Sequence, residues 1–280
     1  PVQVTGQAGG PEPAVAETPF RSPAGGQGAV LVAGLGSIGS VAAAWLAHTC
    51  ERLILVDPDH VDAANPVRQE FQIADVGLPK AEVLAARLGG ITPTVAYQQA
   101  LRSEADVAQI VAQHGIGAAL VATGTSADFA IARGLRACGV AHVVARCYPR
   151  ALYWEAVLVD GERGPAFDDI RGHVTPGPVA APTPEQIAAY SDAGALEAEP
   201  ATLVESGWAA AWAARLAAQF LLPQGLRERW FLELIMSGSI CLVGGGSVQH
   251  TPYGPAYGVA WPGQIHAWRR EHIYGTGRQA

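Results

Sequence analysis

The sequence is poor in several features that mark particular classes of protein. Charged residues occupy 15% of its 280 positions, the net charge is −7, and no run of basic residues is present. Because nucleic-acid phosphates are bound by clustered Lys and Arg, we expect no nucleic-acid partner. The chain shows no charged-then-apolar leader, and its most apolar long segment, 202–222, is interrupted by Glu205, Arg215 and Gln219. We therefore expect neither an export signal nor a membrane span.

Metal-binding patterns are scarce as well. The four cysteines, Cys50, Cys138, Cys147 and Cys241, form no C-x-x-C pair, and the eight histidines show no metal-ligand spacing. Structural zinc requires such clustered ligands, so we expect no zinc site. The expectation that follows from this cysteine usage is a reduced, cytoplasmic protein.

What is present is a long alternation of strands and helices. Residues 1–27 are rich in Pro, Gly and Ala and predict a flexible arm or linker; the missing start Met prompts the hypothesis of a further upstream domain. Beyond the arm, strands are expected at 29–34, 52–56, 94–98, 118–123 and 141–147, and helices begin at 37, 79, 104 and 126. This alternation predicts a Rossmann-like α/β fold, with a mostly parallel sheet and helices on both faces.

The chain divides into a core and an elaborated second half. Residues 28–150 carry the alternating pattern and are expected to form a nucleotide-binding core. Residues 151–280 hold a strand at 152–159, a long Gly/Pro-rich crossover, a helix at 202–222 and short C-terminal strands. We expect this second half to add strands to the same domain.

A glycine-rich turn begins the core. Gly34, Gly36 and Gly39, with Ser37 between them, follow the first strand and open a helix. Such glycines permit a tight turn and let phosphates approach the backbone, while the helix N-terminus attracts the anion. Asp57 ends the next strand, where a carboxylate accepts hydrogen bonds from a ribose diol. The pattern therefore predicts a bound nucleotide.

Polar residues beyond Asp57 distinguish ATP from NAD. The glycine turn alone satisfies the diphosphate of NAD, whereas a triphosphate with a reactive α-phosphorus needs further donors. Asn65, Arg68, Gln69 and Lys80 supply such donors in a stretch otherwise poor in positive charge. A plain NAD-dependent dehydrogenase would leave these donors without a role.

Several ordered motifs over residues 29–147 carry a resemblance to a known family. They are the glycine turn, L-V-D-x-D-x-V, N-x-x-R-Q, D-V-G-x-P-K and, after a helix, x-x-P-x-V. Together they resemble the ThiF/MoeB/HesA and ubiquitin-activating enzyme family. The strand at 152–159 and the helix at 202–222 match more loosely.

The resemblance implies a reaction. Members bind ATP and Mg²⁺ and adenylate the C-terminal Gly-Gly carboxylate of a ubiquitin-like or sulfur-carrier protein, and many are homodimers. Carried over by residue, Asp57 would hold the ribose, Asn65 and Arg68 would contact the triphosphate, and Lys80 would neutralise phosphate charge during attack. Gln69 is a weaker correspondence. The acceptor, whether protein or peptide, stays open.

The chain departs from the family pattern at two places. Where relatives carry T-D-N, whose Asp takes part in Mg²⁺ binding, this chain has Thr123-Gly124-Thr125. Asp128 follows at a helix start, where it would either substitute as the metal ligand or cap the helix. Ala166 and Asp169 stand where many relatives have the P-C-x-x-C of a zinc site.

These departures leave two questions open. The crossover carries no cysteine, and Cys147 and Cys241 are left as the candidates for a thioester-forming residue. The missing metal Asp also keeps a second hypothesis alive, that of a catalytically idle scaffold or partner of an active subunit.

Overall fold

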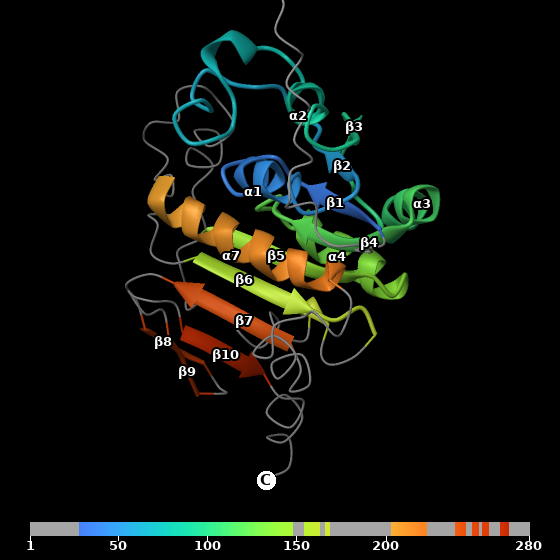
Figure 1. Ribbon diagram of the computed structural model, residues 1–280. Coiled ribbons are helices and arrows are strands. Elements are labelled where there is room, and N and C mark those ends of the chain that lie inside the picture. Colours follow the sequence, from blue (N-terminus) through green and yellow to red (C-terminus); the bar gives the residue numbers. More distant parts are fainter. Residues whose placement is uncertain are drawn as a thin grey trace, which may run out of the picture.

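The computed structural model describes residues 28–147, 154–162, 166–168 and 203–222, together with the backbone of four C-terminal strands. An eight-stranded sheet forms its centre, in the order β10-β7-β6-β5-β4-β1-β2-β3 (Figure 1). The parallel part consists of β1 (Ala29–Ala33), β2 (Leu53–Val56), β3 (Thr94–Tyr97), β4 (Ile116–Val121) and β5 (Ala141–Cys147). Antiparallel strands β6 (Trp154–Val159), β7 (Ser239–Gly244) and β10 (Gln264–Trp268) extend it. A separate hairpin pairs β8 (Val248–Thr251) with β9 (Gly254–Tyr257).

Helices cover both faces of the sheet. On one face, α1 (Gly39–Leu46), α2 (Lys80–Leu88) and α7 (Leu203–Leu221) pack into one hydrophobic cluster, and α7 crosses β4, β5 and β6 (Figure 1). On the other face, α3 (Glu104–His114) and α4 (Ala127–Ala137) pack into a second cluster. A short 3-10 helix, η1 (Ile73–Asp75), lies between β2 and α2.

The composition of the strands explains this layering. β1 and β2 read AVLVA and LILV and are buried throughout. Parallel strands covered on both faces are apolar throughout rather than alternating, because neither face meets water. The predicted Rossmann-like α/β fold, mostly parallel with helices on both faces, is confirmed.

The order of the strands determines where a ligand would bind. β1 lies between β2 and β4, and the helices that follow β1 and β4 pack on opposite faces of the sheet. The loops after these two strands therefore diverge at their carboxyl ends, which is the point where open α/β sheets bind their ligands. Both the glycine turn and the Thr123–Asp128 segment lie at this point.

Element boundaries differ only slightly from the expected ones. The long helix expected at 202–222 is α7, and the strand expected at 152–159 is β6. The first helix begins at Gly39 instead of Ser37. Residues 1–27 and most of the expected crossover lie outside the described part of the chain. None of the helices that the structure describes is long and apolar enough to cross a membrane.

Candidate nucleotide-binding site

In the glycine turn two glycines lie close against neighbouring backbone and a third faces open space. A Cβ on Gly34 would lie 2.6 Å from the Ala122 carbonyl oxygen, and one on Gly39 would lie 1.8 Å from the Gly34 carbonyl oxygen. A Cβ on Gly36 would meet nothing within 4 Å. Gly34 and Gly39 thus serve close packing, whereas Gly36 leaves room for a ligand above the turn.

The N-terminus of α1 is open to an anion. Its N-cap, Ile38, forms no side-chain cap hydrogen bond, and no acidic residue occupies the first turn. The first amide groups of a helix have no partner within the helix, and the helix dipole places partial positive charge there. This arrangement suits a phosphate group.

Asp57 joins the glycine turn to the loop after β2. Its Oδ2 accepts the Leu35 N–H at 2.5 Å and its Oδ1 accepts the Asp59 N–H at 2.8 Å. The carboxylate is buried, and burial raises its pKa while the charge of Lys80 acts in the opposite direction. Each oxygen keeps a second lone pair, so the carboxylate still has acceptor capacity for a ribose hydroxyl.

Lys80 lies next to this acid because the chain folds back on itself. The Val61 N–H donates to the Leu78 carbonyl at 2.8 Å, and the Lys80 N–H donates to the Asp59 carbonyl at 3.0 Å. Lys80 Nζ is consequently 3.4 Å from Asp59 Oδ2. The Lys80 side chain is 9% exposed. Lys80 is also the single lysine in the sequence. A buried lysine beside Asp57 and Asp59 fits a role in charge neutralisation.

Asn65, Arg68 and Gln69 share one compact turn. Asn65 is buried; its Oδ1 accepts the Asp62 N–H at 2.9 Å, and its carbonyl accepts the Arg68 and Gln69 N–H groups at 3.0 Å each. Within the described part of the chain, the half-buried Arg68 guanidinium has no hydrogen-bond or ion-pair partner, and the buried Gln69 Oε1 has no donor. The turn therefore offers a cation and an acceptor that the protein itself leaves unused.

Ser40 connects this turn to the glycine loop, and the sequence analysis missed it. Its Oγ donates to the Gly36 carbonyl at 2.7 Å and accepts the Glu70 N–H at 3.1 Å. Ser40 is fully buried, whereas Ser37, which lies inside the glycine motif, is partly exposed. The available signal was a lone hydroxyl in the otherwise apolar helix GSVAAAWL.

In the structure Asp128 bonds to the loop that precedes α4 and to β5. Its Oδ1 accepts the Thr123 N–H at 3.1 Å and the Thr123 hydroxyl at 2.6 Å, and its Oδ2 accepts Arg146 Nε at 2.7 Å. The expected cap is wrong, since both oxygens bond outside α4. Asp128 is fully buried, and the described residues contain no group of three or more metal-ligating side chains. The residues present do not fit a protein-held Mg²⁺ here, and the metal assignment stays a prediction.

Glu155 lies beside this ion pair and gives a pH prediction. It faces Arg146 across the β5–β6 register, and burial raises the pKa of its carboxyl to about 8, with Arg146 acting in the opposite direction and Asp128 adding to the rise. From pH 4.5 to 8 the folded state therefore keeps a proton that the unfolded state has lost. Stability falls as pH rises through that window, by at most about 1.4 kcal/mol per pH unit.

We expect Glu155→Gln to remove the fall in stability with rising pH. Urea unfolding between pH 7 and 9 measures the free energy of unfolding of both proteins, and the wild type should lose stability relative to the variant as pH rises. This range avoids buried His142, whose pKa is lowered to about 4 by burial and which therefore destabilises the fold only below pH 6.5. A difference between the two proteins that does not change with pH would contradict the prediction.

Three of the four cysteines have described side chains, and all three are at least partly buried. Burial raises the pKa of the Cys50 thiol to about 11, which disfavours the thiolate. Cys138 and Cys147 are half-buried. Cys241 lies in β7, but its side chain is outside the described part of the structure. A thioester-forming cysteine thus stays an open prediction.

Comparisons with known proteins agree with this geometry. Residues 26–125 match the model of the ThiF family. E. coli MccB, solved with ATP, is 16% identical with a TM-score of 0.57, over 87% of this chain and 64% of MccB. PaaA is 13% identical with a TM-score of 0.55, over 86% of this chain and 64% of PaaA.

A third structure is more similar in sequence over a shorter stretch. E. coli TcdA, a tRNA N6-threonylcarbamoyladenosine dehydratase solved with AMP, is 25% identical with a TM-score of 0.41, over 46% of this chain and 57% of TcdA. The chain thus spans less than two thirds of the length of all three proteins. A comparison with curated proteins finds no match. Residues 26–125 thus resemble the ThiF family, and the chain shares its fold with MccB and PaaA.

Proposed function

We propose that this protein uses ATP to adenylate the C-terminal carboxylate of a ubiquitin-like protein, a sulfur-carrier protein or a peptide. The observation that carries the proposal is the position of Lys80, buried beside Asp57 and Asp59 at the carboxyl end of β2. The unpartnered Arg68 turn, tied to the glycine loop through Ser40, adds a second cation at the same edge of the sheet. Two cations next to a ribose acid fit a triphosphate better than the diphosphate of NAD.

The reaction is an in-line displacement at the α-phosphorus. A carboxylate oxygen of the acceptor forms a bond to phosphorus, the bond to the bridging oxygen breaks, and pyrophosphate leaves with the electron pair. An acceptor carboxylate is already ionised at neutral pH, so no general base is required. The difficulty is that two anions meet, which positive charge must offset.

The chain's own residues divide this work. In the proposal the amide groups at the start of α1 bind phosphate and Asp57 orients the ribose. Asn65 and Gln69 contribute polar contacts, while Arg68 and Lys80 neutralise the charge that develops on the outer phosphates. Mg²⁺ would be held chiefly by the phosphates and water, as is common for this ion.

A second candidate function is that of an idle scaffold or partner subunit. The observation in its favour is the buried pair of Asp128 with Arg146, which occupies the loop where family members bind the metal. Calorimetry with ATP, with and without Mg²⁺, separates the two candidates. An active enzyme should bind ATP with metal dependence, and an idle scaffold should bind poorly or without it.

Pyrophosphate exchange into ATP tests the proposed reaction itself. Peptides ending in Gly-Gly, and any protein with a C-terminal glycine that co-purifies, serve as acceptors, and the same peptides with C-terminal amides serve as matched controls. Exchange should appear with the free carboxylates alone. Exchange with amides, or none with any acceptor while ATP is bound, would contradict the proposal.

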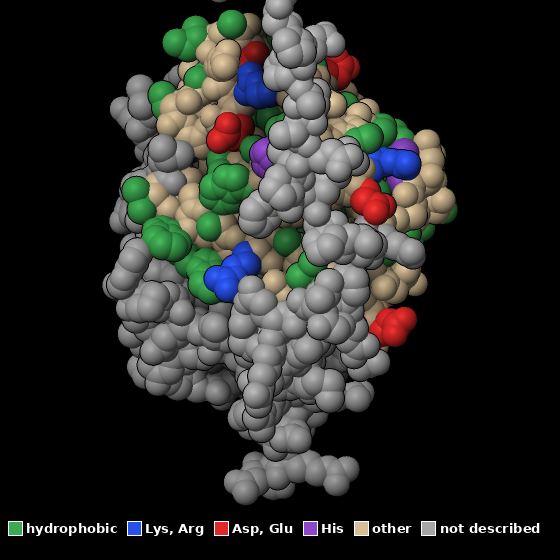
Figure 2. All heavy atoms as spheres, viewed as in Figure 1, with side chains coloured by type: hydrophobic (Ala, Val, Ile, Leu, Met, Phe, Trp, Pro, Cys, Tyr) green, Lys and Arg blue, Asp and Glu red, His purple; other side chains and the backbone are tan. Residues whose placement is uncertain are grey.

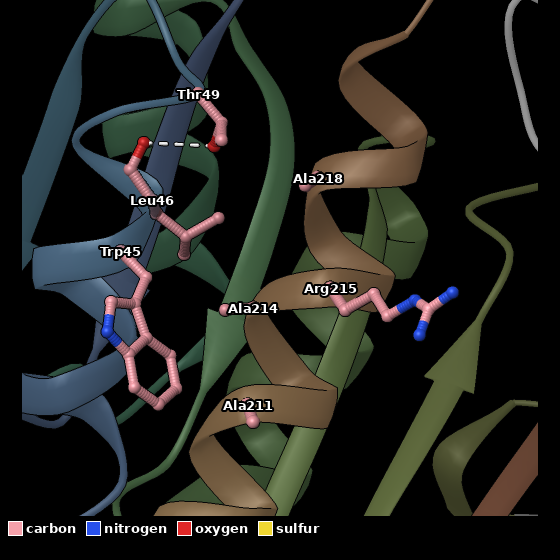
Figure 3. A pocket seen from close by; sticks show the side chains of 7 residues that line it. All are labelled: Trp45, Leu46, Thr49, Ala211, Ala214, Arg215 and Ala218. Carbon is pink, nitrogen blue, oxygen red and sulfur yellow. Dashed lines mark hydrogen bonds between the residues drawn. The ribbon is translucent and has the colours of Figure 1, made fainter.

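We further propose a homodimer through the face formed by α1 and α7. Trp45, Val204 and Trp208 are exposed there, and Figure 2 shows hydrophobic side chains over these helices. A groove of about 400 Å³ separates the helices, with Trp45 on one side, three alanines of α7 on the other, and Arg215 turned away from α1 (Figure 3). Alanines along a helix permit close approach of a second helix.

Light scattering on the wild type and on Trp208→Glu tests the proposed homodimer. The variant should be monomeric, and a mass equal to that of the wild type would contradict the proposal. The cytoplasmic location and an upstream domain stay predictions.

A further inference from the structure

A buried ion pair lies behind the glycine turn. Arg146 Nε donates to Asp128 Oδ2 at 2.7 Å, on side chains that are 15% and 0% exposed. Asp128 belongs to the first turn of α4 and Arg146 to the end of β5, so the pair lies at the carboxyl ends of the parallel strands (Figure 1). The nucleotide site lies at this same edge, yet the proposed reaction uses neither side chain.

The pair holds the loop after β4 at two points. Asp128 Oδ1 accepts both the N–H and the hydroxyl of Thr123, at 3.1 and 2.6 Å. Arg146 Nη2 donates to the Thr125 carbonyl at 3.2 Å. Between these anchors lies Gly124 with φ +68, above which a Cβ would meet nothing within 4 Å. The pair thus fixes the shape of a loop that faces open space.

This loop is the wall against which the glycine turn packs. A Cβ on Gly34 would lie 2.7 Å from the Thr123 nitrogen, and the Ala122 N–H donates to the Ala33 carbonyl at 2.8 Å. The backbone of the loop therefore lies so close to Gly34 that no side chain fits there, and the Ala122–Ala33 hydrogen bond ties the loop to the strand that leads into the turn. A continuous chain of contacts therefore leads from Arg146 through Asp128 and Thr123 to the turn.

Arg146 itself is held firmly in place. Its guanidinium lies 5.1 Å from the Phe129 ring centre and 5.3 Å from that of Phe167. Its charge is already offset by Asp128, with Glu155 opposite it in the strand register. Because Asp128 already neutralises its charge, Arg146 is poorly suited to bind a further anion. It is well suited to hold the Asp128 carboxylate in place.

We propose that Arg146 is a positioning residue for the nucleotide, acting through Asp128 and the Thr123–Thr125 loop to hold the glycine turn in its binding shape. The inference rests on the proposed binding of adenine nucleotides. It extends that proposal, because it places a determinant of affinity on the side of the sheet opposite α1.

Calorimetric binding of AMP without metal tests the inference. AMP is used because it removes any contribution of Asp128 to metal binding. Arg146→Lys keeps a positive charge next to Asp128 but loses the guanidinium group, which also donates to the Thr125 carbonyl. The Kd for AMP should therefore rise about ten-fold. Arg133→Lys is the matched control: Arg133 lies on α4 and makes ion pairs of 3.0 Å with Glu104 and Asp168 at the surface. Its AMP affinity should equal that of the wild type.

Two further variants keep the test decisive. Asp128→Asn combined with Arg146→Gln leaves no uncompensated buried charge, so it provides a folded protein even where Arg146→Lys fails to fold, and it too should bind AMP at least ten-fold more weakly. Amide hydrogen exchange at residues 123–127 should accelerate in both Arg146 variants and not in Arg133→Lys. Wild-type affinity in folded Arg146 variants would overturn the inference alone. A wild-type protein that does not bind AMP would overturn the inference together with the proposed function.

Discussion

Lys80→Ala is expected to weaken ATP binding by about 10- to 100-fold while AMP binding changes about three-fold or less. A hydrogen bond to a charged group contributes about 1.5–3 kcal/mol, which corresponds to this range of affinity. The outer phosphates that Lys80 is proposed to meet are present in ATP and absent from AMP. Calorimetry with both nucleotides measures the difference directly. Arg68→Ala should act in the same direction.

Arg52→Ala serves as the control for loss of positive charge. Arg52 is an exposed residue directly before β2, at the edge of the sheet opposite to the loops after β1 and β2. It should bind both nucleotides as the wild type does. Lys80 is buried and its charge acts on buried Asp57, so urea unfolding has to show that Lys80→Ala is folded before its affinities are compared. Equal losses for ATP and AMP in Lys80→Ala would show that the lysine does not meet the outer phosphates.

Gly39→Ala is expected to destabilise the fold by about 3 kcal/mol or more, at the upper end of the range for overpacked sites. Its new Cβ would lie 1.8 Å from the Gly34 carbonyl oxygen, which belongs to the backbone and can move only with the whole turn. Gly36→Ala is the matched variant, because its Cβ would meet nothing within 4 Å. Urea unfolding of the two proteins gives the comparison.

The same pair of variants separates packing from ligand binding. Gly36→Ala should keep close to wild-type stability but bind ATP at least ten-fold more weakly, because the added methyl group occupies the space through which phosphates approach. A Gly36→Ala protein with wild-type ATP affinity would place the nucleotide elsewhere. A stable Gly39→Ala protein would show that the turn is more compliant than its contacts indicate.

The fold was predictable where one physical signal dominated. The buried strands LILV and AVLVA are continuous apolar runs, and the segment 203–221 is a long and mostly apolar helix. Few other secondary structures are compatible with these patterns. The start of α1 was misplaced by two residues, because Ser37 and Gly39 are both acceptable at the end of a tight turn. Such boundaries depend on the contact between Gly39 and Gly34, which the sequence pattern does not encode.

The site was predictable in its residue types and less so in its partners. The residue types after Asp57 indicated additional phosphate donors, and the structure brings Lys80 back to Asp59 through the pairing of Val61 with Leu78. Their assignment to ATP stays a prediction.

Contacts between residues far apart in the sequence could not be predicted from the sequence. Ser40 meets Glu70 from 30 positions away, and Asp128 meets Arg146 from 18 positions away. Sequence alone gave Asp128 the common choices for an acid at a helix start, a cap or a metal ligand. The decisive partner lies on β5, which is adjacent to the loop only after the sheet has formed.

Labelling with an acyl-phosphate derivative of ATP tests most directly that Lys80 faces the phosphates. In this probe an amine near the phosphates attacks the acyl carbon, the nucleotide leaves, and a stable amide marks the residue. Lys80 is the single lysine of the sequence, so peptide mapping identifies a labelled lysine without ambiguity. We expect the peptide that contains Lys80 to carry the acyl group and excess ATP to prevent this. An unlabelled Lys80, or labelling that excess ATP does not reduce, would contradict the account.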